Sequence, residues 1–185
     1  VEGRGNNVNQ TLVIAAVEVC YKKQKDGSKA KNRRHGRYAG RLRLQVIQGQ
    51  DAKTLCDFVT GAVEPGTMIV TDGWRGYNKL AERGYDHVPA VENGDAEVTE
   101  EFLPIVHLVF SNLKSWLRGC HHGVSEKHLQ AYLNEFTFRF NRRFYPFNTF
   151  RSLLGIGADA EAPTYDGLYS GAWKHPTASA ARVVS

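Results

Sequence analysis

The chain has 185 residues, of which 42% are hydrophobic and 23% are charged, as expected for a globular domain that is large enough to bury a core. No apolar run approaches the roughly 18 residues that span a bilayer, so we expect no membrane partner. The formal charge of +5 and the pI of about 9.2 favour a polyanionic partner.

The first two predicted elements are strands. Residues 11–20 form a continuous apolar run rich in Val and Ala, which predicts a buried strand. Apolar and polar residues alternate over residues 41–47, with Leu42, Leu44 and Val46 on the same side. This pattern predicts a strand with one solvent-exposed face.

A basic segment connects these two strands. Residues 21–43 contain ten Lys and Arg residues and a single acid. Such a cluster can neutralise DNA phosphates and release their counterions. We expect Arg33, Arg34 and Arg37 to contact DNA; a solvated basic loop is the alternative.

Shorter elements follow. Asp51 is a candidate N-cap for a helix over residues 52–60. Residues 67–71 predict a short buried strand, residues 75–82 a short helix, and residues 85–91 a further strand.

Two longer helices come next, after an acidic segment at residues 92–101 that is typical of a loop. Pro104 suits the first turn of a helix that Gly119 would end. Ser125 would cap a second helix, which runs to about residue 142.

Glycine and proline are frequent after Pro146, which predicts a loop-rich, mobile tail. We therefore divide the chain into a domain over residues 1–150 and a tail over residues 151–185. The order of strands and helices in the first part predicts an α/β fold.

Asp72 directly follows the predicted strand at residues 67–71. A carboxylate just past the end of a buried strand lies where α/β proteins bind their ligands. Gly73 permits close approach of a ligand. An ordinary turn aspartate that caps the next helix is the alternative interpretation.

The predicted helix that begins at Pro104 carries an apolar stripe and a separate polar stripe. The polar stripe consists of His107, Ser111, Lys114 and Arg118, at spacings of four, three and four residues. His107 on this stripe is a candidate ligand, although a histidine near a helix start more often has a surface or packing role.

Three segments have a distinctive sequence: TDGWRGY at residues 71–77, LKSWLRG at residues 113–119 and EFTFRFNRR at residues 135–143. Together they resemble ISXO-like insertion-sequence transposases of the DDE type. Between Asp72 and His107 lie 34 residues, and Lys114 follows seven after His107, a spacing similar to that of the family's second acid, third metal ligand and basic residue. The similarity covers about residues 11–143 and implies a ribonuclease H-like fold, a mixed sheet flanked by helices.

The resemblance also implies an activity: metal-dependent cleavage and strand transfer at insertion-sequence ends, with double-stranded DNA as substrate. Asp72 and His107 would bind Mg²⁺ or Mn²⁺, and Lys114 would contact DNA near the scissile phosphate. Many family members carry Glu where His107 stands. Because Mg²⁺ prefers oxygen ligands, the imidazole leaves the choice between the two metals open, with a tilt towards Mn²⁺.

Further basic side chains are candidates for phosphate contacts: Arg75, Arg118, Arg139, Arg142 and Arg143. The last three crowd the end of a predicted helix. Their alternative role is to stabilise that helix C-terminus through its dipole.

The sequence departs from the family in one respect. The family's first catalytic aspartate lies on a strand before residues 11–20, and this sequence has no Asp before Asp26. We expect the chain to begin inside a longer polypeptide, to lack the first strand and first metal ligand, and to have little or no activity alone. The alternatives are a catalytically defective DNA-binding remnant of a transposase and another ribonuclease H-like nuclease.

The cysteines are three in number and far apart, which favours a reducing cytoplasm. The resemblance implies a bacterial cytoplasm, with nucleoid association when DNA is bound. The histidines near Cys120 lack the second ligand pair of a typical zinc site. A homo-oligomer is expected by analogy, because two insertion-sequence ends must be brought together.

Overall fold

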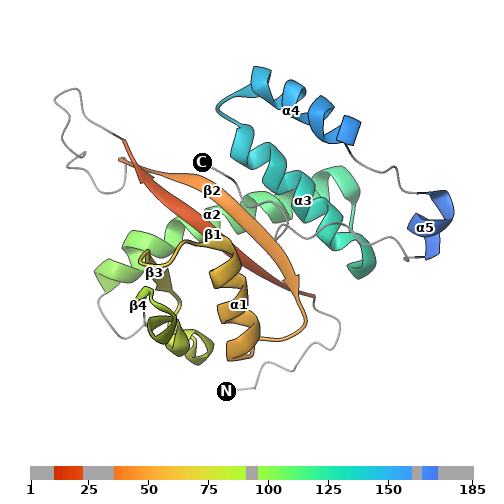
Figure 1. Cartoon of the computed structure of the whole chain (residues 1–185). Coiled ribbons are helices and arrows are strands. Elements are labelled where there is room, and N and C mark those ends of the chain that lie inside the picture. The colour runs from red at the N-terminus through yellow and green to blue at the C-terminus, as the bar shows by residue number, and fades with distance from the viewer. Residues whose placement is uncertain (1–10, 23–35, 91–95, 160–163, 171–185) are drawn as a thin grey trace.

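The structure, a computed structural model, describes residues 11–22, 36–90, 96–159 and 164–170 (Figure 1). Its elements are β1 (Leu12–Tyr21), β2 (Arg37–Ile47), α1 (Ala52–Ala62), β3 (Met68–Thr71), the 3₁₀ helix η1 (Arg75–Arg83), β4 (Asp86–Pro89), α2 (Ala96–His121), α3 (Glu126–Arg142), α4 (Pro146–Asp159) and α5 (Tyr165–Ser170). The mixture of strands and helices confirms the α/β class. Arg33 and Arg34 lie outside the described residues.

β1 and β2 form an antiparallel pair with two different faces. Leu42 and Leu44 are buried in one cluster with side chains of α2 and α3, whereas Ile14 and Ile47 belong to a second cluster with α1. Both predicted strands are confirmed. β1 is covered less completely than predicted, since Glu18 is exposed and most of its other residues are only partly buried.

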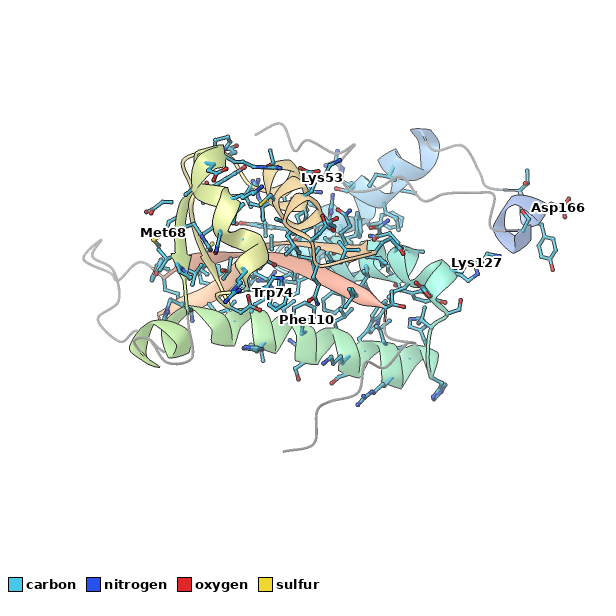
Figure 2. The ribbon with its side chains drawn as sticks, turned by 90° about the horizontal axis from the view of Figure 1, so that it is seen from below. Lys53, Met68, Trp74, Phe110, Lys127 and Asp166 are labelled. Atoms are coloured by element: carbon cyan, nitrogen blue, oxygen red, sulfur yellow. The ribbon has the colours of Figure 1, made fainter. Side chains whose placement is uncertain are left out.

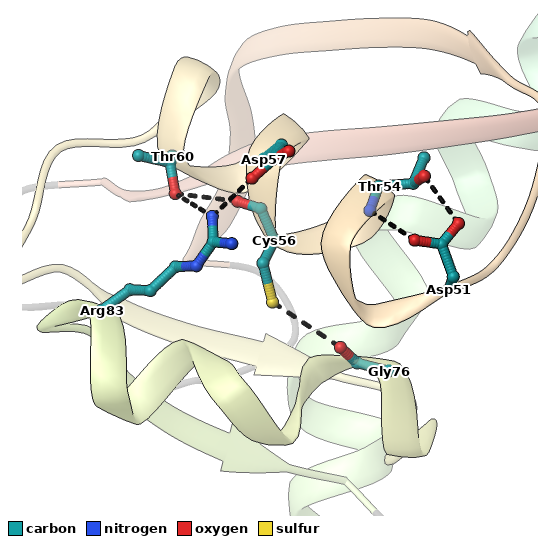
Figure 3. A network of polar contacts seen from close by, with 7 residues as sticks. All are labelled: Asp51, Thr54, Cys56, Asp57, Thr60, Gly76 and Arg83. Carbon is teal, nitrogen blue, oxygen red and sulfur yellow. Dashed lines mark hydrogen bonds and ion pairs between the residues drawn. The ribbon is translucent and has the colours of Figure 1, made fainter.

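α1 begins where its cap predicts. Asp51 accepts hydrogen bonds from Thr54 N at 3.0 Å and from Thr54 Oγ1 at 2.7 Å (Figure 3). These bonds satisfy a free amide of the first turn and lower the pKa of Asp51. Leu55, Phe58 and Val59 of this helix are buried.

β3 and β4 are parallel, and η1 forms the crossover between them. Arg83 of η1 donates to Asp57 Oδ1 at 2.7 Å and to Thr60 Oγ1 at 3.3 Å on α1 (Figure 3). Ile69 of β3 packs against the cluster that contains Ile14 of β1. The two strand pairs therefore share one core, and the predicted strand, helix and strand are confirmed.

α2 is longer than predicted at both ends. It begins at Ala96, so Pro104 lies in its interior, and it continues past Gly119 to His121. A glycine costs a helix only about 1 kcal/mol, which is not enough to end one that is anchored by a buried apolar stripe. Neither α2 nor any other helix in the described ranges is long and apolar enough to cross a membrane.

α3 lies along the outer edge of β2. Asn141 Oδ1 accepts from Leu42 N at 2.7 Å, and Asn141 Nδ2 donates to Leu42 O at 3.0 Å. Gln130 Oε1 accepts from Val46 N at 2.8 Å, and Gln130 Nε2 donates to Leu44 O at 3.4 Å. Side-chain amides thus replace the neighbouring strand that this edge would otherwise need.

The loop-rich tail predicted after Pro146 is wrong for two segments. α4 covers Pro146–Asp159, with its proline in the first turn, and α5 covers Tyr165–Ser170. α4 also spans residue 150, which is the predicted boundary between the domain and the tail. It packs on α3 (Figure 1), while Phe147, Phe150 and Leu154 remain exposed.

Candidate catalytic site

Asp72 follows β3 directly, and its side chain is exposed. Trp74 N donates to Asp72 Oδ1 at 3.2 Å. Gly73 has a φ of +77°, which a residue with a side chain adopts only with strain. The N-cap of η1 is Trp74, so Asp72 belongs to the tight turn that follows the strand and does not cap the helix.

A polar pair lies next to this turn. The buried Thr71 has its Oγ1 2.9 Å from His87 Nε2 and accepts a longer bond from Gly73 N at 3.4 Å. Burial lowers the pKa of His87, so the imidazole is neutral near pH 7 and its Nε2 can accept a hydrogen bond from the Thr71 hydroxyl. This pair could not be predicted from the sequence, because it depends on the pairing of β3 with β4.

Tyr77 packs against the core near the same turn. Burial, and secondly the charge of Asp72, raise the pKa of Tyr77 to about 12. The phenol therefore stays protonated at neutral pH and does not act as a base.

α2 presents the predicted polar stripe to solvent. Val109 and Leu113 are buried, whereas His107, Lys114 and Arg118 are exposed. The helix packs against both β1 and β3, and Trp74 lies above it in Figure 2. The structure therefore brings the helix of His107 and Lys114 against the strand that leads to Asp72.

The described residues fit only part of a divalent metal site. Mg²⁺ usually takes one or two protein carboxylates together with water and substrate oxygens. Asp72 offers one carboxylate and His107 offers an imidazole. No group of three or more His, Cys, Asp or Glu side chains suited to a metal ion occurs in the described part of the chain.

The histidines near Cys120 have different surroundings from one another. His121 lies between the rings of Trp116 and Tyr132, with centroid distances of 4.9 and 4.6 Å, whereas His122 and Cys120 are exposed. The first of these histidines is thus packed among aromatic rings.

The sequence matches the family described as the ISXO2-like transposase domain over residues 1–141. The chain belongs to this transposase family. Neither a curated protein nor a solved structure matches the chain. The match confirms the resemblance seen in the sequence, and a transposase family implies DNA as the substrate.

Arg143 of the transposase chain has a structural role. Its guanidinium donates to the carbonyl oxygens of Ala39, of Gly40 at 3.4 Å and of Phe140 at 2.6 Å. It also lies over the rings of Phe140 and Phe144, at 3.9 and 4.3 Å. These contacts tie the end of α3 to β2, and the bond to Phe140 O is of the kind expected if the arginine stabilises the helix C-terminus.

The other candidate cations of the transposase chain differ in their surroundings. Arg142 lies over the ring of Phe138 at 3.9 Å, and Arg139 forms an exposed ion pair with Glu135 at 3.3 Å. Arg75 is exposed on η1. Exposed ion pairs contribute little to stability, so Arg139 remains a candidate for phosphate contacts. Arg75, Arg142 and the partly buried Arg37 of β2 remain candidates too.

Proposed function

We propose that this transposase domain takes part in metal-dependent DNA cleavage and strand transfer at insertion-sequence ends, with Asp72, His107 and Lys114 in the catalytic site. The packing of α2 on β3 carries the proposal. It brings together the two elements from which an exposed carboxylate, an imidazole and an ammonium group arise. A ribonuclease H-like fold is part of the same proposal.

The strand pairing leaves edges of β1 and β3 at which a further strand could pair. β1 pairs with β2 through one edge, and β3 pairs with β4 through one edge. Within the described ranges no strand pairs with the second edge of either β1 or β3. We propose that a strand bearing the family's first aspartate pairs there, next to Asp72, and completes the ligand set.

Each residue then has a distinct part in the reaction. A bound pair of divalent ions supplies activation of the attacking oxygen and neutralisation of charge on the leaving oxygen. Asp72 and His107 would hold the metal, and the turn at Gly73 orients the carboxylate. Lys114 acts as a point charge that holds a DNA phosphate. His87 and Thr71 keep the turn in place.

The partner is double-stranded DNA, both as insertion-sequence ends and as target. Phosphate contacts by basic side chains would add affinity without sequence information. The candidates are Arg75, Arg118, Arg139, Arg142 and the basic segment with Arg33, Arg34 and Arg37. We also propose a homo-oligomer on DNA, because two ends must be held together, and a cytoplasmic, nucleoid-associated location.

The incomplete ligand set favours one alternative function. If no further carboxylate reaches Asp72, the protein would bind DNA without cutting it. The alternative therefore predicts salt-dependent DNA binding and no metal-dependent product.

A strand-transfer assay separates the two functions. The 185-residue chain and the chain together with its native upstream sequence are incubated with DNA from the ends of the element, in Mg²⁺ or Mn²⁺. We expect little or no product from the shorter chain and clear product from the longer one, with a preference for Mn²⁺.

Substitutions then test the residues. Asp72→Asn should abolish product, and His107→Glu should shift the preference from Mn²⁺ towards Mg²⁺, since it replaces nitrogen by oxygen. His128→Glu, on an exposed position of α3, is the control. Robust product with Asp72→Asn, or unchanged metal preference with His107→Glu, would contradict the assignment.

A further inference from the structure

Trp74 is unusually exposed for its residue type. Its relative exposure is 51%, and it stands two residues after Asp72, in the turn that begins η1. Indole rings are usually well buried and are enriched where proteins contact partners. An exposed tryptophan beside a candidate catalytic carboxylate therefore indicates contact with a ligand that covers the indole.

The indole is held in place despite its exposure. Trp74 Nε1 donates to Gln50 O at 3.2 Å, and Trp74 N donates to Asp72 Oδ1 at 3.2 Å. Gln50 immediately precedes Asp51, the N-cap of α1. Cys56 Sγ contacts Gly76 O at 3.6 Å (Figure 3). The turn is thus bonded to the segment before α1, and the start of η1 is bonded to α1 itself.

Glycine at position 76 allows the ring to lie against the backbone. A Cβ atom there would come within 3.0 Å of Trp74 Cδ1 and within 2.6 Å of Leu55 Cδ1. A side chain at this position would push the indole away or displace the core. The ring therefore rests against the turn on one side and is exposed elsewhere, which is the arrangement of a preformed stacking surface.

We propose that Trp74 stacks on an unpaired DNA base next to the phosphate that is cut. The proposal rests on the proposed function, because it places DNA at Asp72. The immediate neighbours favour nucleic acid over an apolar protein surface: Asp72 and Arg75 are both exposed and charged. Arg75, exposed and next in sequence, would contact a backbone phosphate while the indole covers the base, and every base offers a π-face to an aromatic ring.

The test compares two DNA probes that differ only in their bases. One is a short duplex with a thymidine overhang, and the other is the same duplex with abasic nucleotides in the overhang. Their phosphates are identical, so any difference in the Kd of the 185-residue chain reports contacts with bases. We expect the thymidine probe to bind about 10-fold more tightly, Trp74→Ala to abolish the difference, and Trp74→Phe to retain most of it.

The two substitutions distinguish stacking from a structural role. Neither alanine nor phenylalanine can donate to Gln50 O, so equal loss in both variants would assign the effect to that hydrogen bond and overturn the proposal. An unchanged difference in Trp74→Ala would overturn it too. So would a loss of self-association in Trp74→Ala, measured by sedimentation, with base dependence retained.

The outcome also separates this proposal from the proposed function. If the chain binds both probes equally and in a salt-dependent way, the stacking role fails while the DNA-directed function stands. If the wild-type chain binds neither probe at any salt concentration, DNA binding by these residues fails and the role of Trp74 fails with it.

Discussion

α2 and α3 are neighbouring amphipathic helices whose polar residues serve different purposes. α2 packs on β1 and β3 and turns His107, Lys114 and Arg118 to solvent. α3 lies along the edge of β2 and directs Asn141 and Gln130 to backbone groups of that strand. A polar stripe on a helix therefore indicates a binding site only where its side chains are not already bonded to the backbone of a neighbouring strand.

The largest expected effect concerns the edge contacts of α3. Asn141→Ala removes both partners of Leu42, and each unpaired backbone group costs about 1–3 kcal/mol when buried. We expect the free energy of unfolding to fall by about 2–4 kcal/mol, measured by urea denaturation. Asn112→Ala, the same change on the exposed side of α2, should stay within about 0.5 kcal/mol. Equal effects of the two changes would remove the distinction between the helices.

A smaller effect is expected from the titration of His87. Because burial lowers its pKa from the ordinary value of 6.5, the folded protein binds fewer protons than the unfolded chain below about pH 6.5. Its contribution to stability is complete above that pH and is lost as the pH falls through the lowered pKa. Protonation leaves the contact with Thr71 in place, because a protonated Nε2 can donate to Thr71 Oγ1. The cost is that of charging a partly buried imidazole, for which we expect less than about 1 kcal/mol.

Urea denaturation between pH 7.5 and pH 4.5 measures this titration. His87→Gln should flatten the acid side of the profile, whereas His128→Gln, at an exposed position, should leave it unchanged. A steep acid limb that persists in His87→Gln would assign the loss to other groups.

The smallest effect on stability is expected at Lys114. Lys114→Gln should change the free energy of unfolding by less than about 0.5 kcal/mol, yet reduce the slope of log Kd for DNA against log salt concentration by about 1. Arg143→Gln should do the opposite, because its guanidinium is bonded to carbonyl groups of β2 and α3. A lowered salt slope in Arg143→Gln would show that this arginine reaches DNA after all.

Elements with local signals were predicted from the sequence. The cap at Asp51 and the alternation of Leu42 and Leu44 depend on neighbours a few residues away, and both are confirmed. The early start of α2 was missed because Pro104 fits the first turn of a helix better than its interior. α4 was missed because its glycines resemble loop signals.

The candidate site likewise contains features that local sequence signals predict and features that they do not. The position of Asp72 after a strand could be predicted from the pattern around it. The pairing of Thr71 with His87 and the bond from Trp74 to Gln50 join residues 16 and 24 positions apart. The bonds between Asn141 and Leu42 span 99 positions. Contacts of this kind depend on strand pairing and helix placement, which a single sequence does not specify.

The cover that α3 gives to β2 has a consequence for the behaviour of the protein at high concentration. Two copies cannot align β2 against β2 in a continuous ribbon unless α3 first detaches and its amides release Leu42, Leu44 and Val46. That requirement raises a barrier to fibre-like aggregation through the edge of β2 that α3 covers. Weakening the cover, as in Asn141→Ala, should therefore shorten the shelf life of concentrated samples before any loss of DNA binding is seen.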